Sequence, residues 1–292
     1  KAGGSWAMMT NGRGLSVAWL EEPARYRVVE DLAGGVADVT SLTVEPSLGM
    51  FTTVGYLRAS RTLLLEGSLP TADVNIWTHA LVAVSVPVHG GVARHSSTIV
   101  RGDPQIKEFV RPLFEDAEGV LSFCTFAVDK TAASPYQMLH YALGGTPLRA
   151  RLVHQWRISG YPVYSDAFFV GKRCIVVWHE MGDVDPAPLY FIDSERSESA
   201  AILDPARSVR CSKPAGAFRD TASGADGLVV WANETNELVG RRYSRGDWSA
   251  LYCFGIKSGG AISIEFVGEG RYWVFTDAKG VLKLYELRVS DG

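Results

Sequence analysis

The chain has 292 residues and a formal net charge of −3, and hydrophobic residues make up 47% of it against 21% charged residues. This balance is ordinary for a globular chain that buries a sizeable core, so we do not expect disorder. Charge this close to neutral excludes a general electrostatic attraction for nucleic acid or for an anionic membrane. No apolar run reaches the roughly 18 residues that a membrane-spanning helix needs, so no membrane span is expected.

Short runs of β-branched, aromatic and alternating apolar residues recur along the whole chain, separated by Gly, Pro, Asn and Asp. Such runs predict β-strands, and the residues between them predict turns. No segment has the period of an amphipathic helix of three turns. Asp103 is an acceptable N-cap for a short helical turn over residues 104–109. The sequence therefore predicts an all-β fold.

The predicted strands fall into seven successive sets. They are residues 6–9, 15–21 and 26–32; 39–45, 50–57, 62–66 and 73–77; 80–86 and 93–100; 120–128, 136–143 and 148–158; 164–170, 174–179, 189–193 and 200–203; 209–212, 228–232, 238–243 and 248–254; and 262–267, 272–276 and 281–287. Equivalent strands recur about every 40 residues, which is the spacing of four-stranded propeller blades.

We therefore predict one domain over residues 1–292, a single β-propeller with seven blades of mostly four antiparallel strands. Six blades are the alternative. Two β-sandwiches in tandem would also use many short strands, but no linker rich in Pro, Gly or Ser divides the chain.

The last set has three predicted strands and no fourth, which leaves an edge open to pairing with another strand. We expect the N-terminal strand at residues 4–9 to lie beside the last blade and to close the ring. A strand from a partner protein is the alternative occupant of that edge.

The last set also resembles a blade of the tryptophan-aspartate (WD) repeat family. Residues 274–277 (Val-Phe-Thr-Asp), a Gly turn and residues 282–287 follow the pattern of that blade, and Tyr285-Glu286 stands where the family has Trp-Asp. The match covers about half of one blade. No Gly-His pair opens any of the sets, so the His/Asp hydrogen-bond network of the family is not implied. The resemblance implies a propeller that serves as a platform for protein partners.

From this we predict a non-catalytic scaffold for protein–protein interactions, a subunit of a larger intracellular complex, with no catalytic residues, no cofactor and no metal. The sequence contains no G-x-S-x-G elbow, no HExxH motif and no S-x-D-x-G-x-T-W box of sialidase-type propellers. The first alternative is a carbohydrate-active or small-ligand-binding propeller with its site at the mouth of the central channel. Several convergent carboxylates or three arginines around one pocket would favour that alternative.

Arginines and tryptophans supply the candidate binding residues. The candidates are Arg149, Arg151, Arg157, Arg241, Arg242, Arg245, Trp77 and Trp248. The first three arginines alternate along one predicted strand and share a face, and the other three cluster at the end of another strand. Guanidinium groups suit carboxylate-rich peptides and phosphate chains, so RNA binding is the second alternative, although a salt-bridged surface explains the arginines as well.

The tryptophans divide into two groups. Trp77 and Trp248 are expected to be exposed anchors for a partner. Trp178, Trp231 and Trp273 hold corresponding places in three sets, so we expect them to pack between blades.

The densest polar cluster is residues 179–185, which contains His179, Glu180, Asp183 and Asp185. Its oxygens would suit Ca²⁺ or Mg²⁺, but the spacing fits no ordered calcium loop. We therefore expect a solvated hairpin tip and no metal.

Four cysteines, at 124, 174, 211 and 253, lie far apart beside apolar runs and without C-x-x-C spacing. Buried free thiols are expected, with one disulfide between neighbouring blades as the alternative. Free thiols favour a reducing compartment, so the predicted localisation is cytoplasmic or nuclear.

Overall fold

The structure is a computed structural model. It describes residues 6–10, 15–22, 25–30, 38–45, 52–57, 60–70, 77–89, 91–101, 105–115, 121–128, 136–145, 148–170, 172–181, 188–196, 201–204, 213–258, 262–278 and 281–289. The chain forms two compact units. The first comprises Lys1–Phe109, Glu118–Pro135 and Leu139–Val153, and the second comprises Val110–Ala117, Tyr136–Met138 and His154–Gly292. Among the described residues there is no helix long and apolar enough to cross a membrane.

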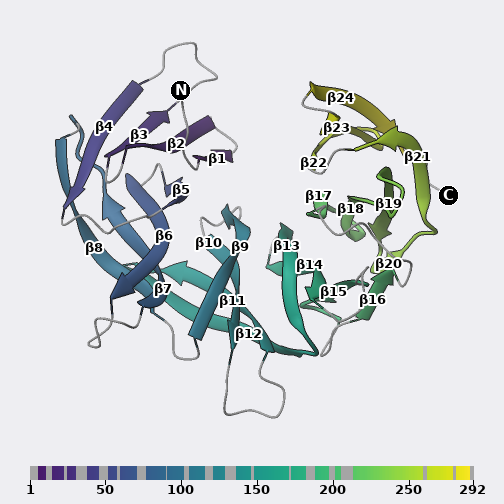
Figure 1. Ribbon diagram of the computed structural model, residues 1–292, viewed down its shortest axis with the longest axis horizontal. Coiled ribbons are helices and arrows are strands. Elements are labelled where there is room, and N and C mark those ends of the chain that lie inside the picture. Colours follow the sequence, from purple (N-terminus) through teal and green to yellow (C-terminus); the bar gives the residue numbers. More distant parts are fainter. Residues whose placement is uncertain are drawn as a thin grey trace. The chain divides into compact units, whose positions relative to one another are not determined.

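Eight strands form one sheet in the first unit, in the order β1-β2-β3-β4-β8-β7-β6-β5 (Figure 1). They are β1 (Trp6–Thr10), β2 (Leu15–Glu22), β3 (Arg25–Glu30), β4 (Asp38–Glu45), β5 (Thr52–Leu57), β6 (Thr62–Pro70), β7 (Trp77–Ser85) and β8 (Gly91–Arg101). Neighbouring strands are antiparallel except β4 and β8, which pair in parallel. The sheet therefore consists of two antiparallel sets, β1–β4 and β5–β8, joined through their last strands, and its core includes Tyr26, Leu42 and Leu63.

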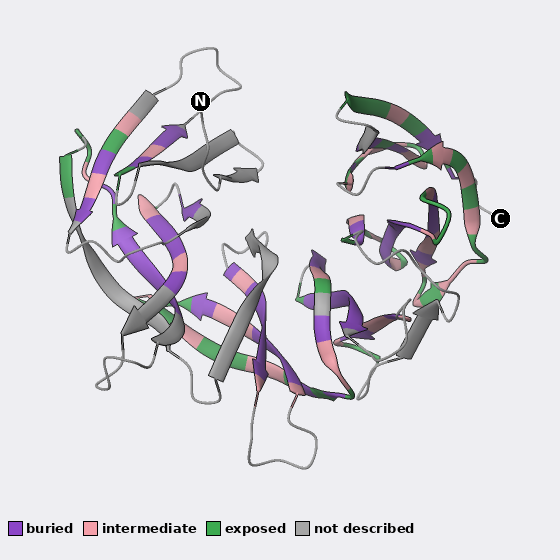
Figure 2. Ribbon diagram, in the orientation of Figure 1, coloured by how far each residue is buried: buried purple, intermediate pink, exposed green. Residues whose placement is uncertain are grey.

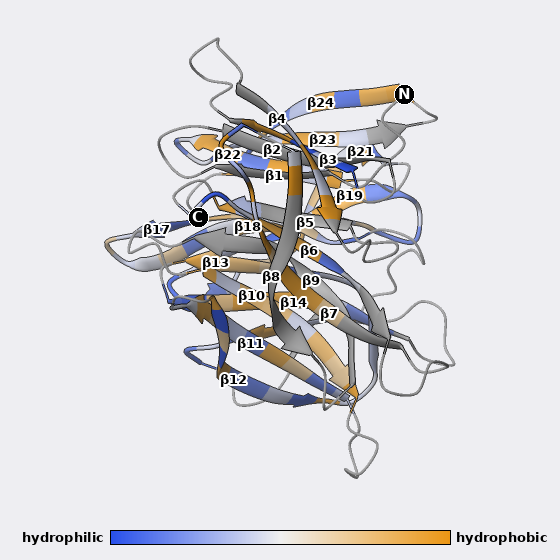
Figure 3. Ribbon diagram, turned by 90° about the vertical axis from the view of Figure 1, so that its left-hand side faces the viewer, coloured by the Kyte–Doolittle hydropathy of each residue, from blue (hydrophilic) through white to orange (hydrophobic). Residues whose placement is uncertain are grey.

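The next sheet has the order β12-β11-β10-β9. Its strands are β9 (Gln105–Glu115), β10 (Leu121–Val128), β11 (Tyr136–Gly144) and β12 (Arg149–Ile158). Pro112 cannot donate a backbone hydrogen bond, and it lies in β9 at the end of the strand order, where a proline is tolerated. The strand β12 is largely hydrophilic (Figure 3).

Three further sheets make up the rest of the second unit, in the orders β13-β14-β15-β16, β17-β18-β19-β20 with β21 beside β19, and β22-β23-β24. Their strands are β13 (Tyr161–Val170), β14 (Arg173–Met181), β15 (Leu189–Asp193), β16 (Ala201–Asp204), β17 (Ala215–Thr221), β18 (Gly224–Ala232), β19 (Glu237–Ser244), β20 (Asp247–Trp248), β21 (Tyr252–Lys257), β22 (Ile262–Gly268), β23 (Arg271–Ala278) and β24 (Val281–Arg288).

The all-β prediction is confirmed, but the predicted grouping of the strands into sets is corrected. Residues 39–45 do not open the second set, because β4 pairs with β3 and completes the first. The predicted second and third sets are one, since β7 pairs with both β6 and β8. The helical turn over residues 104–109 is wrong, because the strand β9 begins at Gln105. Within the described residues the consecutive strands thus form six antiparallel sets, while the number of blades, seven or six, stays a prediction.

Neighbouring sheets of the second unit bury their apolar faces against each other. Phe168 and Ile175 of the β13–β16 sheet share a core cluster with Val229 and Trp231 of the β17–β21 sheet. The other face of the β17–β21 sheet contributes Leu228 to a cluster with the β22–β24 sheet. The strand β18 is therefore buried on both faces along most of its length, which explains its continuous apolar run (Figure 2).

The tryptophans and cysteines only partly follow their predictions. Trp178 and Trp231 are fully buried as expected, but Trp273 is 43% exposed, so its predicted packing between blades is wrong. Cys124 and Cys174 are free and buried as predicted, whereas Cys253 is free but exposed, because β21 alternates between its two faces. The fourth cysteine, at 211, lies outside the described residues. The localisation that these cysteines suggest stays a prediction.

A buried ionic cluster ties the β13–β16 sheet to the β17–β21 sheet. Nε of Arg173 donates to Oδ1 of Asp193 at 2.8 Å, and the Tyr243 hydroxyl bonds to the same two side chains. Burial alone would raise the pKa of Asp193, but hydrogen bonds from Arg173 and Tyr243 hold that pKa below its usual value. Burial, and then the neighbouring Asp193 carboxylate, raise the pKa of Tyr243. The cluster therefore holds an ionised Asp193 and a neutral Tyr243.

Substitution of Asp193 by Ala should lower the free energy of unfolding by about 3 kcal/mol, because the buried Arg173 would keep only the exposed Glu195 as an ion-pair partner. The milder Tyr243→Phe should cost about 1 kcal/mol, the typical value of one hydrogen bond. Urea unfolding followed by tryptophan fluorescence measures both. Asp220→Ala, at an exposed position of β17, is the matched control, and an Asp193→Ala variant as stable as that control would contradict the role of the cluster.

Candidate functional site

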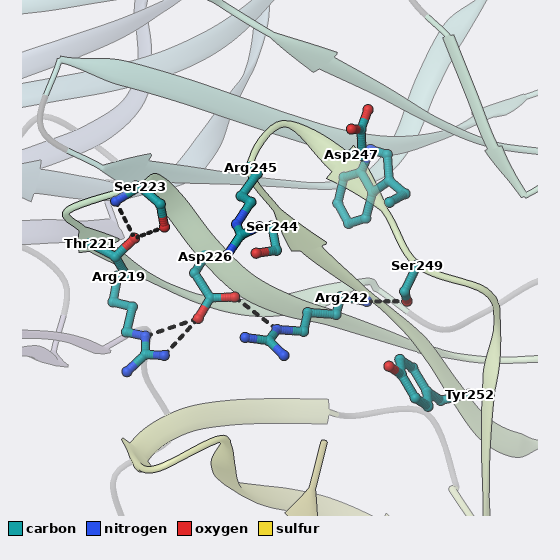
Figure 4. A pocket seen from close by; sticks show the side chains of 11 residues that line it. Arg219, Thr221, Ser223, Asp226, Arg242, Ser244, Arg245, Asp247, Ser249 and Tyr252 are labelled. Atoms are coloured by element: carbon teal, nitrogen blue, oxygen red, sulfur yellow. Dashed lines mark hydrogen bonds and ion pairs between the residues drawn. The ribbon is translucent and has the colours of Figure 1, made fainter. Parts of the chain in front are cut away.

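A cavity of about 620 Å³ lies beside the β17–β21 sheet of the second unit (Figure 4). Its wall is mostly polar and contains three arginines, two aspartates, four hydroxyl side chains and two aromatic rings. The lining residues are Arg219, Thr221, Ser223, Asp226, Arg242, Ser244, Arg245, Asp247, Trp248, Ser249 and Tyr252.

Asp226 is the centre of this wall and is bound by two arginines. Both Nε and Nη2 of Arg219 donate to Oδ2 of Asp226, at 3.0 and 2.7 Å, and Nε of Arg242 donates to Oδ1 at 2.8 Å. The two guanidinium groups reach the carboxylate from opposite sides (Figure 4). One carboxylate therefore connects β17, β18 and β19.

The strand register produces this arrangement. Arg219 lies directly opposite Asp226 in the β17–β18 pair. Asp226 in turn lies opposite Ser244 in the β18–β19 pair, and Arg242 is two residues from Ser244 on the same strand face. Directly opposed and diagonal side chains on one sheet face are close enough to interact, so the three charged groups meet as soon as the strands pair.

The electrostatic state of Asp226 follows from its partners. Its side chain is only 6% exposed, and such burial by itself would raise the pKa of the carboxyl. The hydrogen bonds from Arg242 and Arg219, and their charges, more than offset that effect and hold the pKa of Asp226 below its usual value. Asp226 is thus an ionised counter-ion whose oxygens are already occupied.

The tight turn between β19 and β20 forms a second part of the wall. Ser244 pairs with Asp247, which leaves Arg245 and Gly246 as a two-residue hairpin loop. Their φ angles are +53° and +89°, the positive values that a type I′ turn requires at both positions. The guanidinium of Arg196 donates to the carbonyl oxygens of Arg245 and Gly246 at 3.0 and 3.2 Å. A side chain at position 246 would collide with that guanidinium.

The aromatic part of the wall is also fixed by packing. Trp248 makes edge contacts with the rings of Tyr243 and Phe191, with centroids 4.8 and 5.3 Å apart. Ser249 accepts the backbone N–H of Arg242 at 3.0 Å, which holds the start of the segment that leads to Tyr252. Trp248 therefore presents a half-buried ring that cannot turn freely.

The structure brings together three of the predicted binding residues, since Arg242, Arg245 and Trp248 all line the cavity. Arg241 lies outside the lining, and its Nη1 donates to the Ser249 carbonyl at 3.0 Å. The other predicted arginines, Arg149, Arg151 and Arg157, are exposed on β12. The side chain of Trp77 lies outside the described part of the chain.

Sequence reasoning missed the two residues that organise the wall, Arg219 and Asp226. A signal existed, because Thr221-Ala222-Ser223-Gly224 has the composition of a hairpin turn. Centring a hairpin there places Arg219 opposite Asp226. The hydroxyl side chains and Tyr252 gave no signal that sets them apart from ordinary turn residues.

The acidic cluster at residues 179–185 was predicted to be a solvated hairpin tip, and for its first two residues this prediction is wrong. His179 and Glu180 are buried in β14, and the Ser159 hydroxyl donates to Glu180 at 3.0 Å. Asp183 and Asp185 lie outside the described residues. No group of three or more His, Cys, Asp or Glu side chains placed to hold a metal ion occurs in the parts of the chain that the structure describes.

Comparison with known proteins identifies the fold but not a family. No protein-family model matches the chain, and no curated protein matches it. Solved structures match over nearly its full length. AofleA from Arthrobotrys oligospora has a TM-score of 0.50 at 11% identity, with 99% of this chain and 87% of that chain covered. A glucose dehydrogenase has a TM-score of 0.50 at 14% identity, covering 98% and 96%. Trypanosoma rangeli sialidase has a TM-score of 0.50 at 12% identity, covering 96% and 54%.

The fold is a β-propeller. At identities this low the likeness shows the fold alone. The propeller prediction is confirmed and the tandem sandwiches are excluded, whereas the single domain and the closure of the ring by the N-terminal strand stay predictions. The resemblance to the WD-repeat family has no support from the comparisons.

The Asp226→Asn variant tests the charge cluster of the propeller cavity. We expect it to lower the free energy of unfolding at pH 7 by about 2–3 kcal/mol, less than a fully buried pair because Arg219 is partly solvated. The folded-state pKa of Asp226 is lowered, so its stabilisation is complete above the unfolded value of about 4 and is lost as pH falls further.

Unfolding of the wild type and of Asp226→Asn in urea at pH 7, 4 and 2.5 measures this dependence. The difference between them should shrink toward zero at the lowest pH, and Asp220→Asn should show no comparable difference at any pH. A difference that stays constant with pH would show that the loss comes from the amide, which cannot accept all of these hydrogen bonds, and not from the charge of Asp226.

Proposed function

We propose that this β-propeller binds a carbohydrate in the cavity beside the β17–β21 sheet. The observation that carries the proposal is the convergence of three arginines, several hydroxyls and two aromatic rings in one wall. From the sequence, three arginines around one pocket are expected to favour a ligand-binding propeller over a scaffold, and the lining of this cavity contains three arginines. A sugar has hydroxyl groups that need hydrogen-bond partners and C–H faces that pack on aromatic rings, and this wall offers both.

The size of the cavity agrees with this class of ligand. Its volume of about 620 Å³ lies inside the range of roughly 300–1,000 Å³ that is usual for small-ligand sites. Ser223 and Ser244 can each donate and accept a hydrogen bond, whereas the Thr221 hydroxyl already donates to the Gly224 carbonyl at 2.6 Å. Because Asp226, Arg196 and the Tyr243 ring already hold the neighbouring groups, little conformational entropy is lost on binding.

Binding is better supported than catalysis. The cavity lining contains two carboxylates, Asp226 and Asp247. Asp226 is ionised and saturated by Arg219 and Arg242, so it is a poor general acid, and the Asp247 side chain is 90% exposed. Two solved propellers with the same fold are named for sugar chemistry, a glucose dehydrogenase and a sialidase, which agrees with the ligand class without setting a reaction.

A protein-interaction role of the WD-repeat type is the second candidate, and a different surface favours it. Leu282 and Leu284 of β24 are 72% and 53% exposed, and Trp273 of the adjacent β23 is 43% exposed. Exposed apolar side chains on a strand at the end of its sheet are suited to a protein partner. RNA binding through the arginines of β12 stays a prediction.

A glycan array followed by calorimetry on the bound sugar tests the first proposal. The Trp248→Ala variant should weaken binding by up to about tenfold, because one aromatic contact contributes up to about 1.5 kcal/mol. Trp273→Ala removes an equally large ring outside the cavity and should leave the affinity unchanged. An array without any bound glycan would reject the proposal. Loss of a co-purifying protein on Trp273→Ala, with no glycan bound, would favour the second candidate.

A further inference from the structure

The charges around the cavity do not cancel. The lining holds three arginines, Arg219, Arg242 and Arg245, against two aspartates, Asp226 and Asp247, so its formal charge is +1. Asp247 is the other acidic residue of the wall, and its Oδ1 lies 4.0 Å from Nη1 of Arg196, a residue outside the lining. The electrostatic field inside the cavity therefore favours an anionic group.

Arg219 is held so that part of its guanidinium remains available. Its Nε and Nη2 bind Asp226, while its guanidinium lies 4.3 Å from the centroid of the Phe266 ring. These contacts fix the plane of the group, and the side chain is still 37% exposed. Nη1 is not used in the contacts with Asp226, so it can donate to a ligand without a change of rotamer.

Arg245 has no local structural reason to be an arginine. It occupies the first central position of a type I′ turn, where Asn, Asp or Gly adopts the positive φ more easily. Its backbone is held by Arg196, whereas its exposed side chain has no ion pair among the described residues. A charged, unpaired group held by a strained turn at the rim of a cavity is typical of a residue that meets a ligand.

We propose that the carbohydrate bound in this cavity is an acidic sugar whose carboxylate or sulfate group is recognised by Arg219 and Arg245. This inference rests on the proposed function, because it specifies the ligand of the same cavity. A forked guanidinium matches the paired oxygens of either anion. The partly buried site strengthens the attraction compared with a fully exposed arginine.

The experiment uses the full chain and a glycan array that carries neutral, uronic-acid and sulfated glycans. It is followed by calorimetry with glucuronate, glucose 6-sulfate, glucose and acetate, or with the corresponding set built on the sugar that the array selects. We expect at least one acidic sugar to bind about tenfold more tightly than its neutral counterpart at low salt. The preference should fall as the salt concentration rises, and the two acidic probes tell carboxylate from sulfate.

Arg245→Gln should remove most of that preference, because it should weaken binding of the acidic sugar much more than binding of the neutral sugar. Arg288→Gln deletes a similarly exposed arginine on β24, away from the lining, and should change neither. Thermal unfolding of both variants confirms that they fold.

Equal affinity for acidic and neutral sugars would overturn this inference and leave the proposed function standing. Binding of acetate as tightly as the acidic sugar, or no binding of any glycan, would overturn the proposed function together with the inference. A preference that survives in Arg245→Gln would overturn the role of this arginine.

Discussion

The carboxylate of Asp226, held between two guanidinium groups, is the interaction on which the cavity depends. A buried carboxylate is costly unless it is paired, and here the strand register supplies both partners, because Arg219 lies opposite it and Arg242 lies diagonal to it. The pairing connects three strands, keeps Asp226 ionised and directs two cations toward the same wall. The wall is thus polar and has more positive than negative side chains, and this charge influences which ligands it can bind.

The remaining parts of the wall are fixed by contacts that lie outside it. Trp248 is packed against Tyr243, whose hydroxyl belongs to the buried Arg173–Asp193 cluster, and the hairpin at Arg245 is held from the neighbouring sheet by Arg196. The same contacts that join two sheets of the propeller therefore position the binding groups. A rigid wall costs little entropy when a ligand binds, which is how a small polar cavity reaches useful affinity.

The sequence predicted strands well and their grouping less well. Alternating or continuous apolar runs identify most strands, but β9 and β17 were missed. Only the observed pairing shows that β4 completes the first set and that β7 pairs on both edges. Burial was misjudged in the last sheet, where Trp273 of the middle strand β23 is exposed. In the site, Arg242, Arg245 and Trp248 stood out as charged or aromatic residues at a strand end. Asp226 did not, because its importance comes from register across a turn, which one sequence leaves open.

The contact made by Arg196 has a consequence for how the site could diversify. Its two hydrogen bonds go to backbone carbonyl oxygens, which every residue possesses, and only Gly246 is sterically required beneath it. These two hydrogen bonds therefore hold the backbone of the loop whichever side chains the loop carries. Exchanges at position 247, and at position 245 among residues that tolerate its positive φ, can therefore alter selectivity while the loop itself is preserved.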